Sequence, residues 1–165
     1  GIRTIFNCLG PLANPARASF QLMGIGRPEL MDPMAQALAI LGVDHAILVH
    51  GADGLDEVSL SGKTEIREII GNRVDSKSWS ASEFGLPPVR LDEILAASPA
   101  ESASIVQAIL RNDQIPARNV VLANAAAALL VANRVESLFE GVQIAGDAIR
   151  NGKARQVLQS LIACN

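Results

Sequence analysis

Residues 20–49 read FQLMGIGRPELMDPMAQALAILGVDHAILV, and this stretch decides the fold. It begins with a short apolar run over 20–25 and ends with another over 46–49, and each has the length of a buried strand. Between them, residues 28–41 carry leucine and methionine at intervals of three to four, as one buried helix face requires, and Gly42 ends the helix. Strand, helix and strand with brief loops predict a βαβ unit, in which the strands are parallel and the helix covers them.

The remainder of the chain predicts a hairpin followed by helices. Residues 64–70 alternate polar with apolar side chains, Gly71 and Asn72 supply turn chemistry, and a second strand fits residues 73–79. The C-terminal part has a helical pattern throughout, including an alanine-rich helix near residues 120–131. The order is therefore α/β first and helices afterwards, in one domain.

Composition and charge exclude several kinds of partner. With 14 basic and 17 acidic residues the net charge is −3, which argues against a nucleic-acid or anionic-membrane surface. The longest apolar stretch, residues 125–132, is far below the roughly 20 residues that a membrane-spanning helix needs. The only cysteines, Cys8 and Cys164, are far apart and typical of reduced thiols. We therefore expect a cytoplasmic protein that binds neither nucleic acid nor membranes.

Two phosphate-binding motifs are present only in part. Residues 24–26 (Gly-Ile-Gly) follow a strand, but a dinucleotide fingerprint needs glycine or alanine where the chain has Glu29. Residues 62–64 (Gly-Lys-Thr) resemble the end of a P-loop, but its first glycine would fall at Glu57. We expect neither segment to bind a nucleotide. The two histidines flank a predicted strand without an identifiable nucleophile partner, and we expect them to be structural.

The segment HGADGLDE, residues 50–57, is named the acidic loop here. It directly follows a buried strand, which is where ligands usually bind in an open α/β sheet. Its carboxylates, Asp53, Asp56 and Glu57, are hard oxygen ligands that suit Mg²⁺, which takes one or two carboxylates together with phosphate oxygens. The alternative is a solvated turn, in which aspartates bond the backbone and glycines supply positive φ. Spacing alone favours the turn, and both interpretations stay open.

The N-terminal segment has a second unusual composition. Gly10-Pro11 and Asn14-Pro15 fix the backbone twice within six residues, and glycine permits a ligand to approach closely. From physical chemistry alone, a rigid loop that leads into the first strand explains this pattern.

These segments together resemble the signature of the anthranilate phosphoribosyltransferases. The similarity lies in RTIFN over 3–7, LGPL over 9–12, Asn-Pro at 14–15, DGLDEVS over 53–59 and Asn-Ala-Ala over 124–126. It covers essentially the whole chain, and nucleoside phosphorylases share the fold but not this combination. The resemblance implies a central, largely parallel sheet flanked by helices, as in the C-terminal domain of nucleoside phosphorylases and phosphoribosyltransferases.

The same resemblance implies an activity and site residues. Enzymes of this family transfer the phosphoribosyl group from phosphoribosyl pyrophosphate to anthranilate, giving N-(5-phosphoribosyl)anthranilate and pyrophosphate in tryptophan biosynthesis. By resemblance, Asp56 and Glu57 hold Mg²⁺ on the pyrophosphate, while Gly10 and Pro11 line the path by which anthranilate enters. A cation there is chemically reasonable, because the departing pyrophosphate needs its developing negative charge neutralised. The resemblance assigns no catalytic residue to this chain.

The resemblance also sets expectations for domain organisation. Residues 1–165 are expected to form one α/β domain. We expect this domain to be a fragment of a longer enzyme and to be inactive in isolation. The family's helical N-terminal domain, its dimer contact, its glycine-rich phosphate loop and its anthranilate-binding arginine would all precede Gly1, and we expect a homodimer for the intact enzyme. Residues 97–100 lack a double glycine that the family often has. Two rival functions stay open: a pyrimidine nucleoside phosphorylase and a non-catalytic interaction module.

Overall fold

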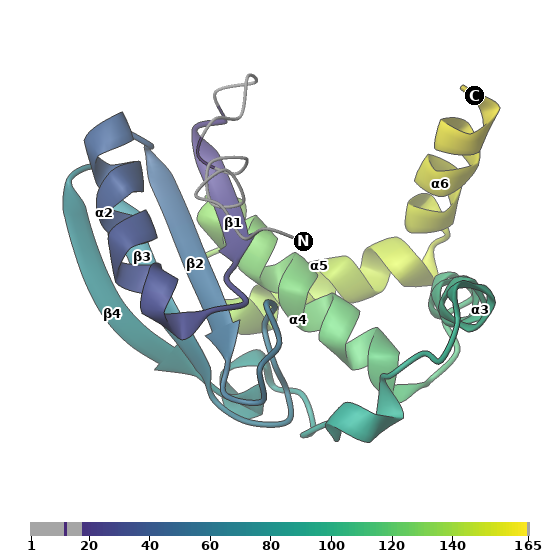
Figure 1. Cartoon of the computed structure of the whole chain (residues 1–165). Coiled ribbons are helices and arrows are strands. Elements are labelled where there is room, and N and C mark those ends of the chain that lie inside the picture. Colours follow the sequence, from purple (N-terminus) through teal and green to yellow (C-terminus); the bar gives the residue numbers. More distant parts are fainter. Residues whose placement is uncertain (1–11, 13–17, 165) are drawn as a thin grey trace.

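The strands of a four-stranded sheet lie in the first half of the chain, and helices from both halves cover its two faces (Figure 1). The computed structural model describes residue 12 and residues 18–164. The strands are β1 (Phe20–Gly24), β2 (His45–Gly51), β3 (Thr64–Ile70) and β4 (Arg73–Trp79), in the spatial order β1-β2-β3-β4. β1 pairs with β2 in parallel, whereas β2 with β3 and β3 with β4 are antiparallel.

The βαβ unit predicted over residues 20–49 is confirmed. A short 3-10 turn, η1 (Pro28–Leu30), leads into α2 (Met31–Leu41). The helix ends at Gly42, whose φ of 75° is readily adopted only by a residue without Cβ. The predicted hairpin is confirmed as β3 and β4, with Gly71 in the left-handed region at the turn. The α/β class is therefore confirmed, and the described sheet combines the parallel pair of the βαβ unit with this antiparallel hairpin.

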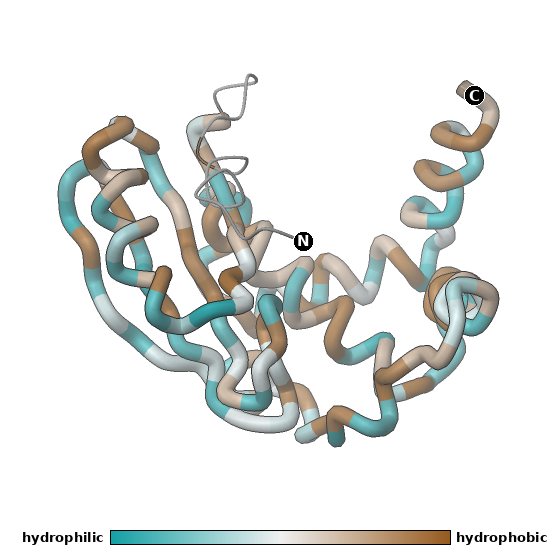
Figure 2. The backbone as a smooth tube through the Cα atoms, viewed as in Figure 1, coloured by the Kyte–Doolittle hydropathy of each residue, from teal (hydrophilic) through white to brown (hydrophobic). Residues whose placement is uncertain are grey.

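Strand β2 is buried along its whole length, which explains why it reads as a continuous apolar run rather than an alternating one. Successive side chains of a strand point to opposite faces. Ala46 and Leu48 accordingly pack into a cluster with α2, and Ile47 and Val49 pack into the cluster formed with the C-terminal helices. β2 thus contributes side chains to both hydrophobic cores, and Figure 2 shows its hydrophobic backbone colouring.

The second half of the chain is helical, as predicted. After two 3-10 turns, η2 (Ala81–Phe84) and η3 (Leu91–Glu93), the chain forms α3 (Pro99–Leu110), α4 (Pro116–Val131), α5 (Leu138–Arg150) and α6 (Lys153–Ala163). Helix α4 lies against β1 and β2, and α5 packs on α4. Helix α6 extends away from the sheet (Figure 1). Its apolar side chains Val157, Leu161 and Ile162 are exposed. Across the part of the chain described, no helix has the length and apolarity to traverse a bilayer.

Candidate functional site

The acidic loop leaves the carboxyl end of β2 and folds back on itself in two tight turns. The Gly51 amide donates to the carbonyl of Leu55 at 2.8 Å, and the Gly54 amide donates to the carbonyl of Gly51 at 2.8 Å. Gly54 has a φ of 91°, a conformation that L side chains rarely adopt. The glycines of this loop therefore serve the turn, as one of the two interpretations of the sequence required.

Asp53 is committed to holding the loop together. Its Oδ1 accepts from the Leu55 amide at 3.2 Å, and its Oδ2 accepts from Ser59 Oγ at 2.6 Å and from Ser61 Oγ. Burial raises the pKa of the Asp53 carboxyl, but these hydrogen bonds outweigh it and hold the pKa below the ordinary value of 3.8. This geometry matches the turn interpretation for Asp53.

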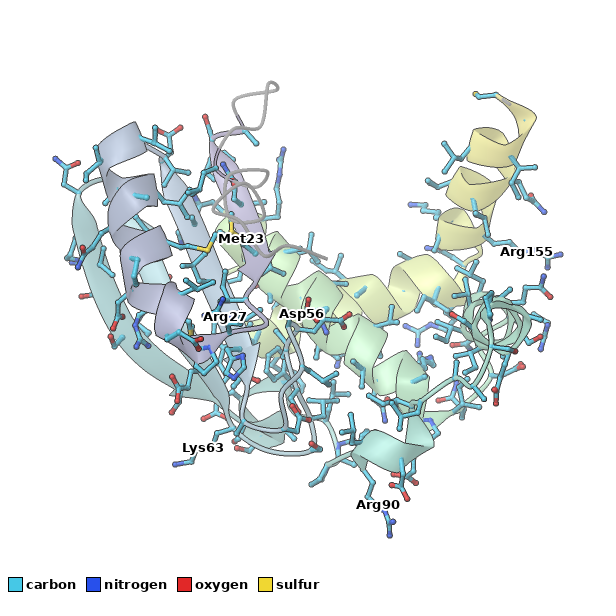
Figure 3. All side chains as sticks on the ribbon, viewed as in Figure 1. Met23, Arg27, Asp56, Lys63, Arg90 and Arg155 are labelled. Carbon is cyan, nitrogen blue, oxygen red and sulfur yellow. The ribbon has the colours of Figure 1, made fainter. Side chains whose placement is uncertain are left out.

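Asp56 and Glu57 differ from Asp53, because both are exposed. Within the described residues, neither carboxylate is engaged in a hydrogen bond or ion pair with another side chain. Figure 3 places Asp56 on the loop beside α4. Among residue 12 and residues 18–164, no group of three or more His, Cys, Asp or Glu side chains could hold a metal ion by itself. Two free, adjacent carboxylates fit a cation that phosphate oxygens and water also ligate, which is how Mg²⁺ usually binds.

Two other elements contact the backbone at Asp56 and directly after the pair, at Val58. A Cβ built on Gly24, at the end of β1, would overlap the carbonyl oxygen of Asp56 and lie 2.6 Å from its carbonyl carbon. On the other element, Asn124 of α4 accepts from the Val58 amide at 2.9 Å and donates to the Val58 carbonyl at 3.2 Å. Sequence reasoning gave neither Gly24 nor Asn124 a role, although Asn124 stood in a motif of the resemblance.

Both histidines have structural partners, in agreement with the expectation from the sequence. His50 Nδ1 lies 2.7 Å from the carbonyl oxygen of Ile25, which ties the start of the acidic loop to the segment after β1. His45 Nε2 lies 3.1 Å from Glu68 Oε1 across β2 and β3. Gly10 and Pro11, which the resemblance assigns to the anthranilate path, lie outside the described residues.

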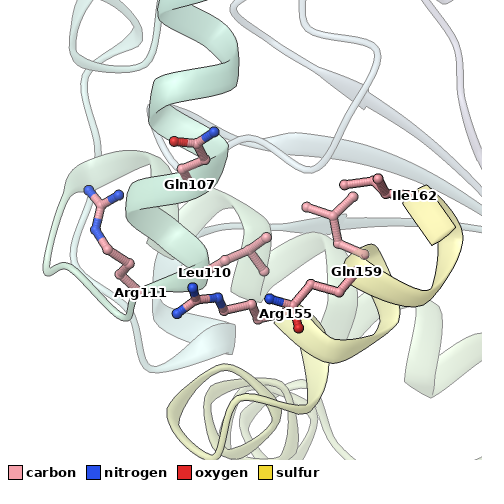
Figure 4. Close-up of a pocket in the computed structure, with 7 residues that line it drawn as sticks. Gln107, Leu110, Arg111, Arg155, Gln159 and Ile162 are labelled. Carbon is pink, nitrogen blue, oxygen red and sulfur yellow. The ribbon is translucent and has the colours of Figure 1, made fainter.

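Two surface cavities lie away from the acidic loop. A cavity of about 330 Å³ lies between α3 and α6. Its lining residues include Gln107, Arg111 and Arg155 (Figure 4). Another, of about 230 Å³, lies beside Pro87 and Pro88. Neither of these two cavities is lined by Asp56 or Glu57.

Comparisons with known proteins agree with the fold and with the resemblance seen in the sequence. The model of the glycosyl transferase family, a/b domain, matches residues 1–155. The anthranilate phosphoribosyltransferase of Thermomicrobium roseum is 46% identical over 164 residues, covering 98% of this chain and 47% of that protein. That of Symbiobacterium thermophilum is 45% identical over 161 residues, covering 98% and 47%. The chain thus spans about half the length of the curated relatives it matches.

Solved structures give the same relationship. The crystal structure of anthranilate phosphoribosyltransferase from Thermus thermophilus matches with a TM-score of 0.85 and 34% identity, covering 99% of this chain and 48% of that one. The Saccharomyces cerevisiae enzyme in complex with phosphoribosyl pyrophosphate and Mg matches with a TM-score of 0.84 and 30% identity, covering 96% and 46%. The resemblance to anthranilate phosphoribosyltransferases expected from the sequence is confirmed.

Proposed function

The chain belongs to the glycosyl transferase family, whose a/b domain spans its residues 1–155, and from that premise we propose that it is the α/β part of an anthranilate phosphoribosyltransferase. The proposed reaction joins the amine nitrogen of anthranilate to C1 of the ribose and breaks the bond from C1 to pyrophosphate. The observation that carries the proposal is the exposed pair Asp56 and Glu57, at the carboxyl end of β2, in a chain about 45% identical to such enzymes.

In this proposal Asp56 and Glu57 hold Mg²⁺ together with the pyrophosphate oxygens of the substrate. The Saccharomyces cerevisiae relative has been solved in complex with phosphoribosyl pyrophosphate and Mg, which supports this choice of cation. Bound there, the cation would neutralise the charge that develops on the leaving pyrophosphate. The chain's own contribution is to present two carboxylates on a fixed backbone, so that the sugar phosphate binds in one orientation.

The domain organisation and partners form part of the same proposal. Since the chain spans about half the length of its relatives, we expect the full activity to need the remaining half and this chain alone not to turn over substrate. We expect the intact enzyme to be a cytoplasmic homodimer. Gly10 and Pro11 are proposed to line the anthranilate path, so Gly10→Val in the intact enzyme should raise KM for anthranilate and leave KM for phosphoribosyl pyrophosphate little changed.

One assay of the full-length protein tests the proposal against its rivals. The protein is given anthranilate with phosphoribosyl pyrophosphate, and loss of anthranilate fluorescence is followed. In parallel it is given thymidine or uridine with inorganic phosphate. We expect transfer to anthranilate and no phosphorolysis. Phosphorolysis without transfer would assign the chain to the pyrimidine nucleoside phosphorylases, and activity with neither pair would favour a non-catalytic module.

A further inference from the structure

We infer that Gly24 and Asn124 are positioning residues, which fix the backbone that carries Asp56 and Glu57. The inference rests on the proposed metal role of that acidic pair. Neither residue is expected to touch the metal or the sugar phosphate. Gly24 contacts the main chain at Asp56 from a strand, and Asn124 binds the main chain at Val58, directly after the acidic loop, from a helix.

Asn124 binds the loop immediately after the acidic pair. Its Oδ1 accepts from the Val58 amide, and its Nδ2 donates to the Val58 carbonyl, so one side-chain amide satisfies both polar groups of one backbone residue. Val58 is buried, and its backbone groups would lose these partners if the amide were removed. Nδ2 also donates to the carbonyl of Val120 at 3.0 Å, one turn earlier in α4, which fixes the orientation of the amide plane.

Gly24 acts by having no side chain. It pairs with Val49 in the parallel ladder of β1 and β2, so β1 cannot move away from the loop without breaking that pairing. Any Cβ at this position would overlap the carbonyl of Asp56, which is backbone and cannot rotate away as a flexible side chain would. These two backbones can approach so closely only because residue 24 has no side chain.

Gly26 provides an internal comparison for Gly24. A Cβ on Gly26 would meet Asp56 only at the aspartate Cβ, at 3.9 Å, which is ordinary van der Waals contact. Asn119 provides the comparison for Asn124, because it lies on α4 and lines the cavity beside Pro87 rather than the loop. Gly26→Ala and Asn119→Ala are therefore matched controls for Gly24→Ala and Asn124→Ala.

The test uses the full-length protein and two readouts that do not depend on turnover. Hydrogen exchange of peptides that cover residues 52–60 reports the loop backbone. Electron paramagnetic resonance of Mn²⁺ in the presence of inorganic pyrophosphate reports cation binding. In Asn124→Ala we expect exchange at the Val58 amide to become about tenfold faster and Mn²⁺ affinity to fall by about three- to tenfold, as loss of one or two hydrogen bonds predicts. Gly24→Ala should weaken Mn²⁺ binding similarly, and both controls should match the wild type.

The outcomes separate this inference from the proposed function. If Asp56→Ala and Glu57→Ala weaken Mn²⁺ binding while Gly24→Ala and Asn124→Ala bind it normally, the positioning role is wrong and the metal role stands. If the acidic variants themselves bind Mn²⁺ normally, the metal role is wrong and the inference falls with it. Should Gly24→Ala fail to fold, Asn124→Ala against Asn119→Ala decides the question from α4. Should Asn124→Ala fail to fold, Gly24→Ala against Gly26→Ala decides it from β1.

Discussion

Helices α5 and α4 are in direct contact where Gly141 of α5 faces Ala126 of α4. A Cβ built on Gly141 would lie 2.8 Å from both the Cα and the Cβ of Ala126. It would also lie 3.1 Å from the carbonyl oxygen of Ala126. Ala126 stands two residues after Asn124 on α4. The packing of α5 on α4 therefore supports the helix from which Asn124 binds Val58, directly after the acidic loop.

This contact predicts that Gly141→Ala destabilises the protein, although alanine favours helices more than glycine does. Both helix backbones would have to move apart, and overpacking of this kind costs about 1–3 kcal/mol of unfolding free energy. Gly146→Ala on the same helix is the control, because its Cβ would meet only Arg118 Nη2 at 3.9 Å and should leave stability unchanged or raise it by up to about 1 kcal/mol. Urea unfolding of both variants decides, and equal stabilities would contradict the close crossing.

Asp53 predicts a pH-dependent contribution to stability. Its hydrogen bonds hold the folded-state pKa below the ordinary value of 3.8, so the charged carboxylate stabilises the fold above that value. The contribution is lost as pH falls through the folded-state pKa. Asp53→Ala should cost about 1–2 kcal/mol at pH 7, as the loss of hydrogen bonds to a charged group does. The difference from the wild type in the free energy of unfolding, measured in urea, should narrow as the pH falls below 3.8. A difference independent of pH would show that charge is not involved.

We predict that the carboxyl group of Glu83 has an unusually low pKa. Ser80 Oγ donates to Glu83 Oε2 at 2.6 Å and the Ser80 amide donates to the same oxygen at 2.8 Å. The hydrogen bonds from Ser80 lower the pKa of Glu83 to about 2. Carbon-detected NMR of the carboxyl group should show this midpoint, and Ser80→Ala should move it upward, since one donor is lost. A wild-type midpoint near 4.5 would refute the hydrogen-bonding pattern.

Local pattern sufficed to predict the elements, but not the contacts that fix the site. The helix that ends at Gly42 and the hairpin that turns at Gly71 both follow from spacing among sequence neighbours, where periodicity and turn chemistry act. Asn124 and Val58 are 66 residues apart, and no periodicity connects them. In the sequence, Gly24 was interpreted only as part of an incomplete nucleotide-binding motif. Its contact with the backbone of Asp56 could not be predicted, because a sequence does not reveal that another backbone lies against a glycine.

The three carboxylates of the acidic loop have different environments in the structure, and these too depend on tertiary contacts that the sequence pattern does not reveal. Spacing placed Asp53, Asp56 and Glu57 together as equivalent oxygen ligands. In the structure the Asp53 carboxylate accepts hydrogen bonds from Ser59 and Ser61, whereas Asp56 and Glu57 are exposed. The difference depends on where the serines after the loop return to it, which is a tertiary property. The resemblance assigned a metal role to Asp56 and Glu57 and not to Asp53, and that role stays a prediction.

The acidic pair supplies the prediction on which the proposed function depends most directly. Asp56→Ala or Glu57→Ala in the intact enzyme should lower kcat/KM for phosphoribosyl pyrophosphate, because less of the leaving-group charge would be neutralised. Losing one carboxylate ligand should lower the rate about 10²-fold, which corresponds to about 2.7 kcal/mol of transition-state stabilisation. Raising Mg²⁺ should restore part of the activity, since the missing ligand weakens cation affinity rather than removing a reacting group.

A matched control separates loss of a ligand from loss of charge near the sheet. Asp44→Ala removes an exposed carboxylate at the opposite end of β2, so it should keep the wild-type rate and Mg²⁺ dependence. Asp56→Asn and Glu57→Gln keep the size of the side chains while removing the charge that attracts the cation, and they should behave like the alanine variants. If all four acidic-pair variants show the wild-type rate and Mg²⁺ dependence, Asp56 and Glu57 belong only to a turn. Loss of a cation ligand must change the Mg²⁺ concentration that half-saturates the enzyme.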